Sequence, residues 1–266
     1  MSSRNLFLRT HDCLHRADPE QKCRCVNVLA SDWRAGLLSA GPAAVAPFGD
    51  PGRPARPVLV APRKLPRRKL TTLAGHAALI HALCHIEFNA INLALDAVYR
   101  FRDLPDAYYG DWLQVAEEEA YHFGLLRDHL QTRGYDYGDF PAHNGLWEMA
   151  EQTADDPLIR MALVPRVLEA RGLDVTPDIK QKLAGAGDDA GSAILDIIQR
   201  DEVGHVQIGS RWFRYLCELR GQDPDSTFRK LLSTHMKGTI RGPLDRQARL
   251  RAGFSEVELD YLEGAG

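Results

Sequence analysis

The sequence predicts an all-α protein whose core is a four-helix bundle, and three observations point to this fold class. Apolar residues recur every three or four positions over several long stretches, which is the spacing of one face of an α-helix. Glycine and proline clusters separate these stretches and mark turns. Two of the stretches contain Glu-x-x-His near their centre, a motif that some four-helix bundles use to bind metal ions.

The periodic stretches are long enough for bundle helices, and several have a clear start or stop signal. Gly134 is expected to cap the second helix, Pro157 to open a new piece after a break, and Pro165 to kink that piece. A linker helix is expected near residues 178–183, and two or three short helices from residue 223 onward. The expected bundle helices cover residues 71–100, 106–133, 145–155 with 157–170, and 190–220. The chain is thus divided into an arm (1–69), the bundle (70–221) and a C-terminal extension (222–266).

The first part of the arm, residues 5–38, has a weak helical pattern, with a helix start at Asp18. It contains Cys13, Cys23 and Cys25. A zinc site is one interpretation, but Cys-x-Cys is a poor match to the usual spacing of zinc ligands. Unpaired cysteines are the favoured interpretation, since five cysteines in 266 residues do not suggest a disulfide framework.

The second part of the arm, residues 41–70, is a proline-rich strap that cannot form a continuous helix. It carries seven basic residues and no acidic one between positions 53 and 69: Arg53, Arg56, Arg63, Lys64, Arg67, Arg68 and Lys69. Contact with a polyanion such as tRNA is one explanation. The favoured one is a segment lying along the bundle, with Val58, Leu59 and Val60 packed and the basic side chains solvated.

The candidate functional residues are the two Glu-x-x-His motifs, Glu119 with His122 and Glu202 with His205. Residues three apart project from the same face of a helix, so each motif points a carboxylate and an imidazole at one spot. Both motifs lie on the apolar face of their helix, where an ionisable side chain is costly unless it is paired or bound to metal.

One further glutamate precedes each motif on another helix. Glu87 lies 32 residues before Glu119 and Glu169 lies 33 residues before Glu202, as expected for two similar helical hairpins. One Glu from each of two helices plus Glu-x-x-His from each of two others is the ligand set of a dinuclear metal site in a bundle. The sequence therefore predicts six ligands for two metal ions.

Composition limits the alternatives. A net charge of −3 argues against a protein that coats nucleic acid over its whole surface. No apolar run approaches the roughly 20 residues that cross a bilayer, and the first residues lack the apolar core of a signal peptide. A cytoplasmic location without membrane contact is expected.

Several motifs together resemble a known family. They are Lys-Leu-Thr at 69–71, His-Ile-Glu at 85–87, Glu-Glu-Ala-Tyr-His-Phe at 118–123, Leu-Glu-Ala-Arg-Gly-Leu-Asp-Val-Thr-Pro at 168–177 and Arg-Asp-Glu-Val-Gly-His-Val at 200–206. With them, residues 70–221 resemble the ferritin-like superfamily of di-iron carboxylate proteins, and in detail an uncharacterised bacterial branch, domain of unknown function 455. The stretch is more distantly similar to the tRNA hydroxylase that modifies isopentenyl-adenosine.

The resemblance implies a ferritin-like bundle with two iron ions held by the six residues above. Carboxylates and imidazoles suit iron or manganese. An acid directly before the motif glutamate supports the site in related proteins, which selects Asp201 and, at the equivalent place, Glu118. Tyr121 and His85 are further candidates because they are near the ligands in the sequence.

Three classes of function fit this set. The favoured one is an oxygen-dependent oxidoreductase or hydroxylase acting on a small organic molecule, which would need an electron donor. The second is a metal-storage or peroxide-handling protein, and the third is a structural or partner-binding protein with a metal site. A tRNA substrate is kept as a less favoured alternative. The sequence does not select the substrate, the donor or the oligomeric state.

Overall fold

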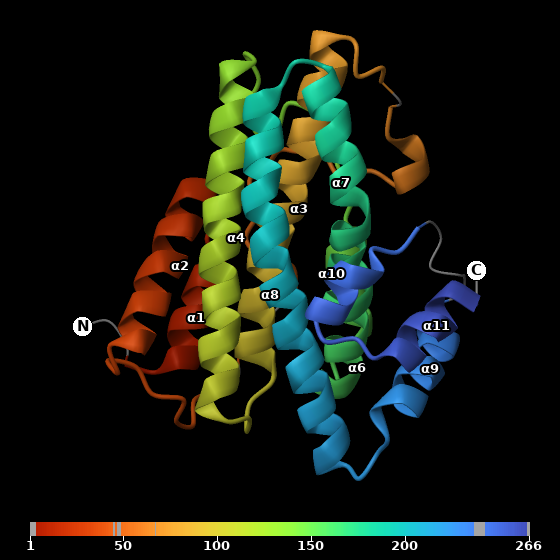
Figure 1. Ribbon diagram of the computed structural model, residues 1–266. Coiled ribbons are helices and arrows are strands. Elements are labelled where there is room, and N and C mark those ends of the chain that lie inside the picture. Colours follow the sequence, from red (N-terminus) through yellow and green to blue (C-terminus); the bar gives the residue numbers. More distant parts are fainter. Residues whose placement is uncertain (1–3, 45, 47–48, 67, 237–242, 265–266) are drawn as a thin grey trace. The chain divides into compact units, whose positions relative to one another are not determined.

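The protein is an all-α helical bundle, which confirms the predicted fold class. The computed structural model describes residues 4–44, 46, 49–66, 68–236 and 243–264 (Figure 1). Within them β-pairing is limited to two isolated bridges, Asn5 with Ser39 and Leu59 with Ala142. The chain forms two compact units, Met1–Trp147 and Glu148–Gly266, which we call unit 1 and unit 2 and describe separately.

Unit 1 is built on a hairpin of two long helices, α3 (Leu73–Arg100) and α4 (Asp106–Thr132). The Thr72 hydroxyl caps the start of α3 by accepting the Gly75 N–H at 3.1 Å. A Cβ at position 75 would lie 2.0 Å from the Lys69 carbonyl oxygen, so only glycine fits this return of the chain. The expected cap of α4 is present, since Gly134 has a φ of 78°.

The helix α3 is also the described helix that is long and apolar enough to cross a membrane, by length and composition alone. Its most apolar window has a mean hydropathy of 1.3, and 72% of that window is buried within the protein. This burial favours the role of a core helix.

The arm contributes α1 (Leu6–Leu14), which packs on α3, and α2 (Pro19–Arg34), which packs on α4. As expected, α2 starts at Asp18, whose side chain accepts the Gln21 N–H at 2.8 Å. The expectation of unpaired cysteines is wrong for two of them: Cys13 of α1 and Cys25 of α2 form a disulfide, with Cα atoms 5.5 Å apart. The sequence pattern missed it because the pairing depends on how the two helices pack.

The predicted packing of the strap is also wrong in part. Val58 and Leu59 are 61% and 38% exposed. The strap is held by its backbone instead, since the Val60 N–H donates to the Ala142 carbonyl at 2.8 Å and the Ala142 N–H donates to the Val58 carbonyl at 3.1 Å. Arg53, expected in solvent, has only 16% of its side chain exposed. Pro47 and Arg67 of the predicted strap lie outside the described residues, as do residues 1–3 of the chain start.

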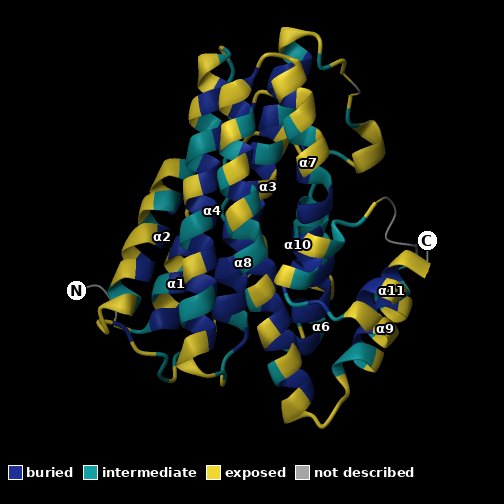
Figure 2. Ribbon diagram, in the orientation of Figure 1, coloured by how far each residue is buried: buried dark blue, intermediate teal, exposed yellow. Residues whose placement is uncertain are grey.

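Unit 2 contains a second helical hairpin, and one of its two sides is an interrupted helix. The interrupted side consists of α6 (Pro157–Leu163), a single π-turn η2 (Val164–Glu169) and α7 (Ala170–Gly185). The other side is the continuous helix α8 (Asp189–Leu219). Buried residues recur along one face of α8, as Figure 2 shows. The remaining helices are α5 (Gly145–Gln152), α9 (Pro224–His235), α10 (Arg246–Arg251) and α11 (Glu256–Gly264).

Two expectations for this region need correction. The third bundle helix does not end near Gly172, and residues 178–183 are not a separate linker helix, because α7 runs through both regions with Pro177 inside it. The Pro177 ring removes one backbone hydrogen bond, but buried contacts on both sides keep the helix continuous. Asp174 before it pairs with the buried Arg249 at 2.7 Å, and Leu183 after it is buried.

The helix α3 carries a second, polar stripe that the periodic pattern did not single out. Its members recur every three or four residues and are all buried: His81, His85, Asn89, Asn92 and Asp96. The arm, the loop after α4 and α3 itself satisfy much of this stripe. The Gly138 N–H of the loop donates to His81 at 2.9 Å, and Arg100 at the end of α3 pairs with Asp96 at 2.8 Å.

Lys22 of α2 is the most unusual partner of this stripe. Its side chain is fully buried, and its Nζ donates to the Leu14 carbonyl at 2.9 Å and to the Asn92 side chain. Nζ also lies 5.3 Å from the centroid of the Phe88 ring. Burial, and secondarily the charge of Arg53, lower the pKa of Lys22 from 10.5 to about 7.

This burial predicts a pH-dependent cost. Between about pH 7 and 10.5 the unfolded chain holds a proton on Lys22 that the folded chain lacks, so stability should rise with pH in that window. Relative to a Lys22→Met variant, the free energy of unfolding of the wild type should rise by up to about 1.4 kcal/mol per pH unit. Urea unfolding of both proteins at several pH values measures this difference. The control is Lys64→Met, which replaces an exposed lysine. A difference in free energy of unfolding between the wild type and Lys22→Met that does not change with pH would contradict the prediction.

Candidate metal centre

Unit 1 brings three of the predicted ligands together. The Nδ1 atom of His122 lies 3.6 Å from Glu87 Oε2 and 3.6 Å from Glu119 Oε2. Glu119 and His122 are one turn apart on α4, and Glu87 reaches them from α3. Each of these residues offers one possible ligand atom, and these atoms lie within 4.8 Å of one another. Atoms bonded to one ion at about 2.0–2.2 Å are about 3–4 Å apart, so this spacing fits a metal site.

The three residues are removed from solvent, which governs their charge. Burial raises the pKa of Glu87 well above its usual range, and the nearby Glu119 carboxylate raises it further. Burial alone would lower the pKa of His122, but its contacts with Glu119 and Glu87 outweigh burial and raise that pKa to about 11. At neutral pH the cluster therefore retains bound protons unless another cation takes their place. A cluster of buried Glu and His of this kind could hold a metal ion.

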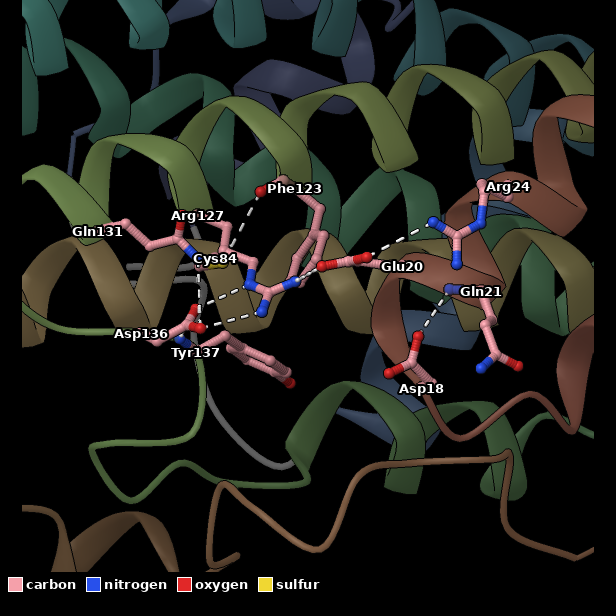
Figure 3. A network of polar contacts seen from close by, with 10 residues as sticks. All are labelled: Asp18, Glu20, Gln21, Arg24, Cys84, Phe123, Arg127, Gln131, Asp136 and Tyr137. Atoms are coloured by element: carbon pink, nitrogen blue, oxygen red, sulfur yellow. Dashed lines mark hydrogen bonds and ion pairs between the residues drawn. The ribbon is translucent and has the colours of Figure 1, made fainter.

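Neighbouring contacts tie the two ligand helices together at this level. The buried Cys84, one turn before Glu87, donates its thiol to the Phe123 carbonyl at 3.9 Å, beside His122 (Figure 3). Burial raises the pKa of the Cys84 thiol well above its usual value, so it stays protonated and serves as a donor.

The C-terminal part of α4 is held by Arg127, which bonds to the acids of two other segments (Figure 3). Its guanidinium donates to both carboxylate oxygens of Asp136, at 2.7 and 2.9 Å, and to Glu20 of α2 at 3.3 Å. The bond from Arg127 lowers the pKa of Asp136. This network fixes the loop after α4, which carries Tyr137 against α3.

Unit 2 repeats the central pair of unit 1. His205 Nδ1 lies 3.6 Å from Glu202 Oε1, the same ring nitrogen and the same distance as in the His122–Glu119 pair. His205 is fully buried, and 13% of the Glu202 side chain is exposed. Glu169 ends the π-turn η2, which packs on α8, and is half-buried.

The predicted supporting residues vary in their surroundings. Asp201 accepts hydrogen bonds from its neighbour Arg200 at 2.8 and 3.2 Å, and Glu118 accepts one from Gln114 at 2.9 Å. Tyr121 is 54% exposed. Roles for these residues at a metal centre stay predictions.

His85 is buried, and both ring nitrogens bond away from the ligand cluster. Nε2 lies 3.0 Å from the His143 carbonyl oxygen and 3.0 Å from the Asn89 side-chain nitrogen, and Nδ1 lies 2.9 Å from the Tyr137 hydroxyl. Burial lowers the pKa of His85 to about 4, so the ring is neutral at ordinary pH. His85 and Glu87 are two residues apart and thus project from different faces of α3.

Similarity to known proteins adds a family. The model of the family "Protein of unknown function (DUF455)" matches residues 15–260. The chain belongs to the DUF455 family. An uncharacterized protein of Haemophilus influenzae is 47% identical to it over 260 residues, which cover 94% of this chain and 90% of the relative. No solved structure matches the chain. The DUF455 description names no reaction.

The cluster of unit 1 predicts the effect of one substitution. Glu119→Gln keeps the size of the side chain and removes a negative charge from a buried cation site. The affinity for Mn²⁺ should fall at least about 10–100-fold, the loss typical of a damaged metal site. Calorimetric titration of metal-free protein measures this.

The matched control is Glu117→Gln, on the same helix but paired with Arg34 at the surface. It should bind Mn²⁺ like the wild type. Equal affinity in the Glu119→Gln and Glu117→Gln variants, both folded by thermal melting, would show that Glu119 is not a ligand.

Proposed function

We propose that this DUF455 protein is a di-iron carboxylate oxidoreductase that uses dioxygen to oxidise a small organic molecule. In this proposal the six ligands that the ferritin-like resemblance implies are Glu87, Glu119 and His122 in unit 1 and Glu169, Glu202 and His205 in unit 2. Manganese suits the same ligands, and metal analysis of the purified protein distinguishes the two.

The observation that carries the proposal is the repeated Glu–His pair. Two helices, α4 and α8, each place an imidazole Nδ1 3.6 Å from the carboxylate of the glutamate one turn earlier. A buried histidine needs only one hydrogen-bond partner per nitrogen, so packing alone does not require this repetition. Two equivalent metal positions would require such a repeated Glu–His pair.

Charge balance supports two divalent ions. Four glutamates contribute four negative charges, which two divalent ions offset, and the two buried ones, Glu87 and Glu119, would be costly to keep charged without cations. When bound, iron at such a site would supply the redox chemistry that activates dioxygen. The residues of the chain would position the ligands and exclude water. The bond from Cys84 to Phe123 joins α3 to α4, and the apolar residues around it would cover the site.

Oxygen use implies a second partner. Insertion of one oxygen atom into a C–H bond, with the other reduced to water, consumes two electrons and two protons besides dioxygen. An electron donor, a reductase or a small redox protein, is therefore part of the proposal.

A small molecule is the proposed substrate class because part of the basic strap is engaged with the protein itself. The Arg53 guanidinium lies 5.7 Å from the Trp147 ring centroid, and that of Arg68 lies 5.0 Å from the Phe140 ring centroid. A cytoplasmic location is proposed as well, although the Cys13–Cys25 disulfide is more typical of oxidising compartments.

The proposal is tested by loading the metal-free protein with Fe²⁺ without oxygen and then mixing it rapidly with dioxygen. About two iron ions per chain should bind, and a transient visible absorption band should appear on mixing. Glu119→Gln and Glu202→Gln should each lower the bound iron and suppress the band. Protein that binds fewer than two ions, or binds two that do not react with dioxygen, would contradict the assignment.

The strap gives a separate prediction about nucleic acid. Binding through phosphates weakens steeply with salt because each neutralised phosphate releases counterions. We expect no tRNA binding at low salt in a gel-shift or anisotropy assay. Tight binding at low salt, lost when Arg63, Lys64, Arg67 and Arg68 are all changed to Ala but kept when Arg229 and Lys230 are, would replace the small molecule with an RNA substrate.

A further inference from the structure

We infer that the C-terminal extension positions Glu169 by clamping the π-turn η2, with Arg166 and Glu258 as the positioning residues. The inference rests on the proposed role of Glu169 as a ligand, and all its contacts lie within unit 2. It assigns a function to residues 222–266, for which the metal-binding motifs give none.

The π-turn decides the direction of Glu169. It spans Val164–Glu169 and contains one residue more than an α-helical turn would. Each residue rotates an α-helix by about 100°, so without this extra residue Glu169 would point about 100° away from its present direction. Single π-turns inside α-helices are rare and are frequently found at functional sites. Something must hold this one in place.

One support is a close approach between η2 and α8. A Cβ at Gly209 would lie 2.4 Å from both Cβ and Cγ of Pro165, far below the van der Waals distance of about 3.5–4.0 Å. The proline ring is rigid, so only glycine lets η2 lie this near to α8. Pro165 is four residues before Glu169, and Gly209 is four residues after His205. The contact therefore fixes the positions of Glu169 and His205 relative to each other along the axes of the two neighbouring helices.

The second support is Arg166, the residue after Pro165. Its guanidinium is buried inside a cage of three aromatic rings, with centroids at 4.6 Å (Phe213), 4.2 Å (Phe228) and 4.6 Å (Phe254). Phe213 belongs to α8, whereas Phe228 and Phe254 come from the C-terminal extension. The charge is matched by Glu258 of α11, whose Oε2 accepts from Arg166 Nη2 at 2.6 Å.

Glu258 is itself fixed by a second task. The Ser255 N–H donates to Glu258 Oε2 at 2.9 Å, and the Glu258 N–H donates to the Ser255 hydroxyl at 3.0 Å, which is a capping box at the start of α11. The carboxylate that pairs with Arg166 is thus held by the helix it caps.

The extension also contacts the far end of the π-turn. Arg249 of α10 donates to the Ala170 carbonyl, directly after Glu169, at 3.4 Å, and pairs with Asp174 one turn later. The turn is therefore held on both sides of Glu169. Buried ion pairs often contribute little net stability because desolvation offsets their attraction. Two such pairs flank one π-turn, which favours a role in fixing its geometry over a role in stability.

The test uses Glu258→Gln, which removes the charge facing Arg166 but keeps a residue that serves in the capping box. A second variant, Gly209→Ala, pushes Pro165 away without changing any charge. Glu256→Gln, an exposed acid of the same helix that pairs with Arg246, and Gly172→Ala, where a Cβ meets nothing within 4 Å, are the matched controls. All are made in the full chain.

Two measurements are needed. Hydrogen exchange of the metal-free proteins reports whether residues 164–170 open more often, and Mn²⁺ titration reports the two binding steps. In both test variants, exchange of this segment should rise at least about tenfold and the weaker Mn²⁺ step should weaken at least about tenfold, with the other step unchanged. The controls should match the wild type in both.

Unchanged exchange of residues 164–170 in Glu258→Gln would overturn the clamp whether or not metal binds. A looser π-turn with both Mn²⁺ affinities unchanged, measured well below the unfolding temperature, would show a purely structural ion pair and overturn the positioning role. Wild-type protein that binds no metal would overturn the proposed function and the positioning role together, and exchange would still report the clamp.

Discussion

The burial of three ionisable groups at one point of unit 1 is the constraint on which the rest of the structure depends. Glu87, Glu119 and His122 are at most 4% exposed, so solvent cannot stabilise their charges. A carboxylate and an imidazole can share a proton, but a second carboxylate at the same spot makes the need for positive charge larger. The contacts around the cluster keep these side chains together despite that cost. The fold accepts a locally unfavourable arrangement that a bound cation would relieve.

The periodic pattern identified the candidate ligands because Glu-x-x-His is a local feature. Residues three apart share a helix face whatever the tertiary structure is, so His122 and Glu119 could be paired from the sequence alone. The pairing of Glu87 with this motif required only a hairpin, which the glycine and proline signals predicted. Most helix ends were placed within a few residues for the same reason, whereas the third bundle helix was expected to end near residue 170 and instead continues as α7 to Gly185.

The features that the sequence did not predict depend on contacts between distant segments. The Cys13–Cys25 disulfide needs two arm helices to pack, and the passage of α7 through Pro177 needs Arg249, 72 residues later in the chain, to hold its first turns. The kink expected at Pro165 is a π-turn because Gly209 offers space for it. The polar stripe of α3 was visible as His81, His85, Asn89, Asn92 and Asp96 at helical spacing. The sequence pattern did not show which residues pair with this stripe, such as Lys22 with Asn92.

The polar stripe and the ligand face divide α3 between two kinds of contact. On one side the helix presents Glu87 to α4, and on the other it presents His85 and Asn92 to the loop after α4 and to the arm. A rotation of the helix by even one residue would break both sets at once, because each set fixes the same angle about the same axis. The arm is therefore more than a cover for apolar surface. Through the bond of Lys22 to Asn92 it helps to fix the rotation of α3, and this rotation sets the direction in which Glu87 points toward His122.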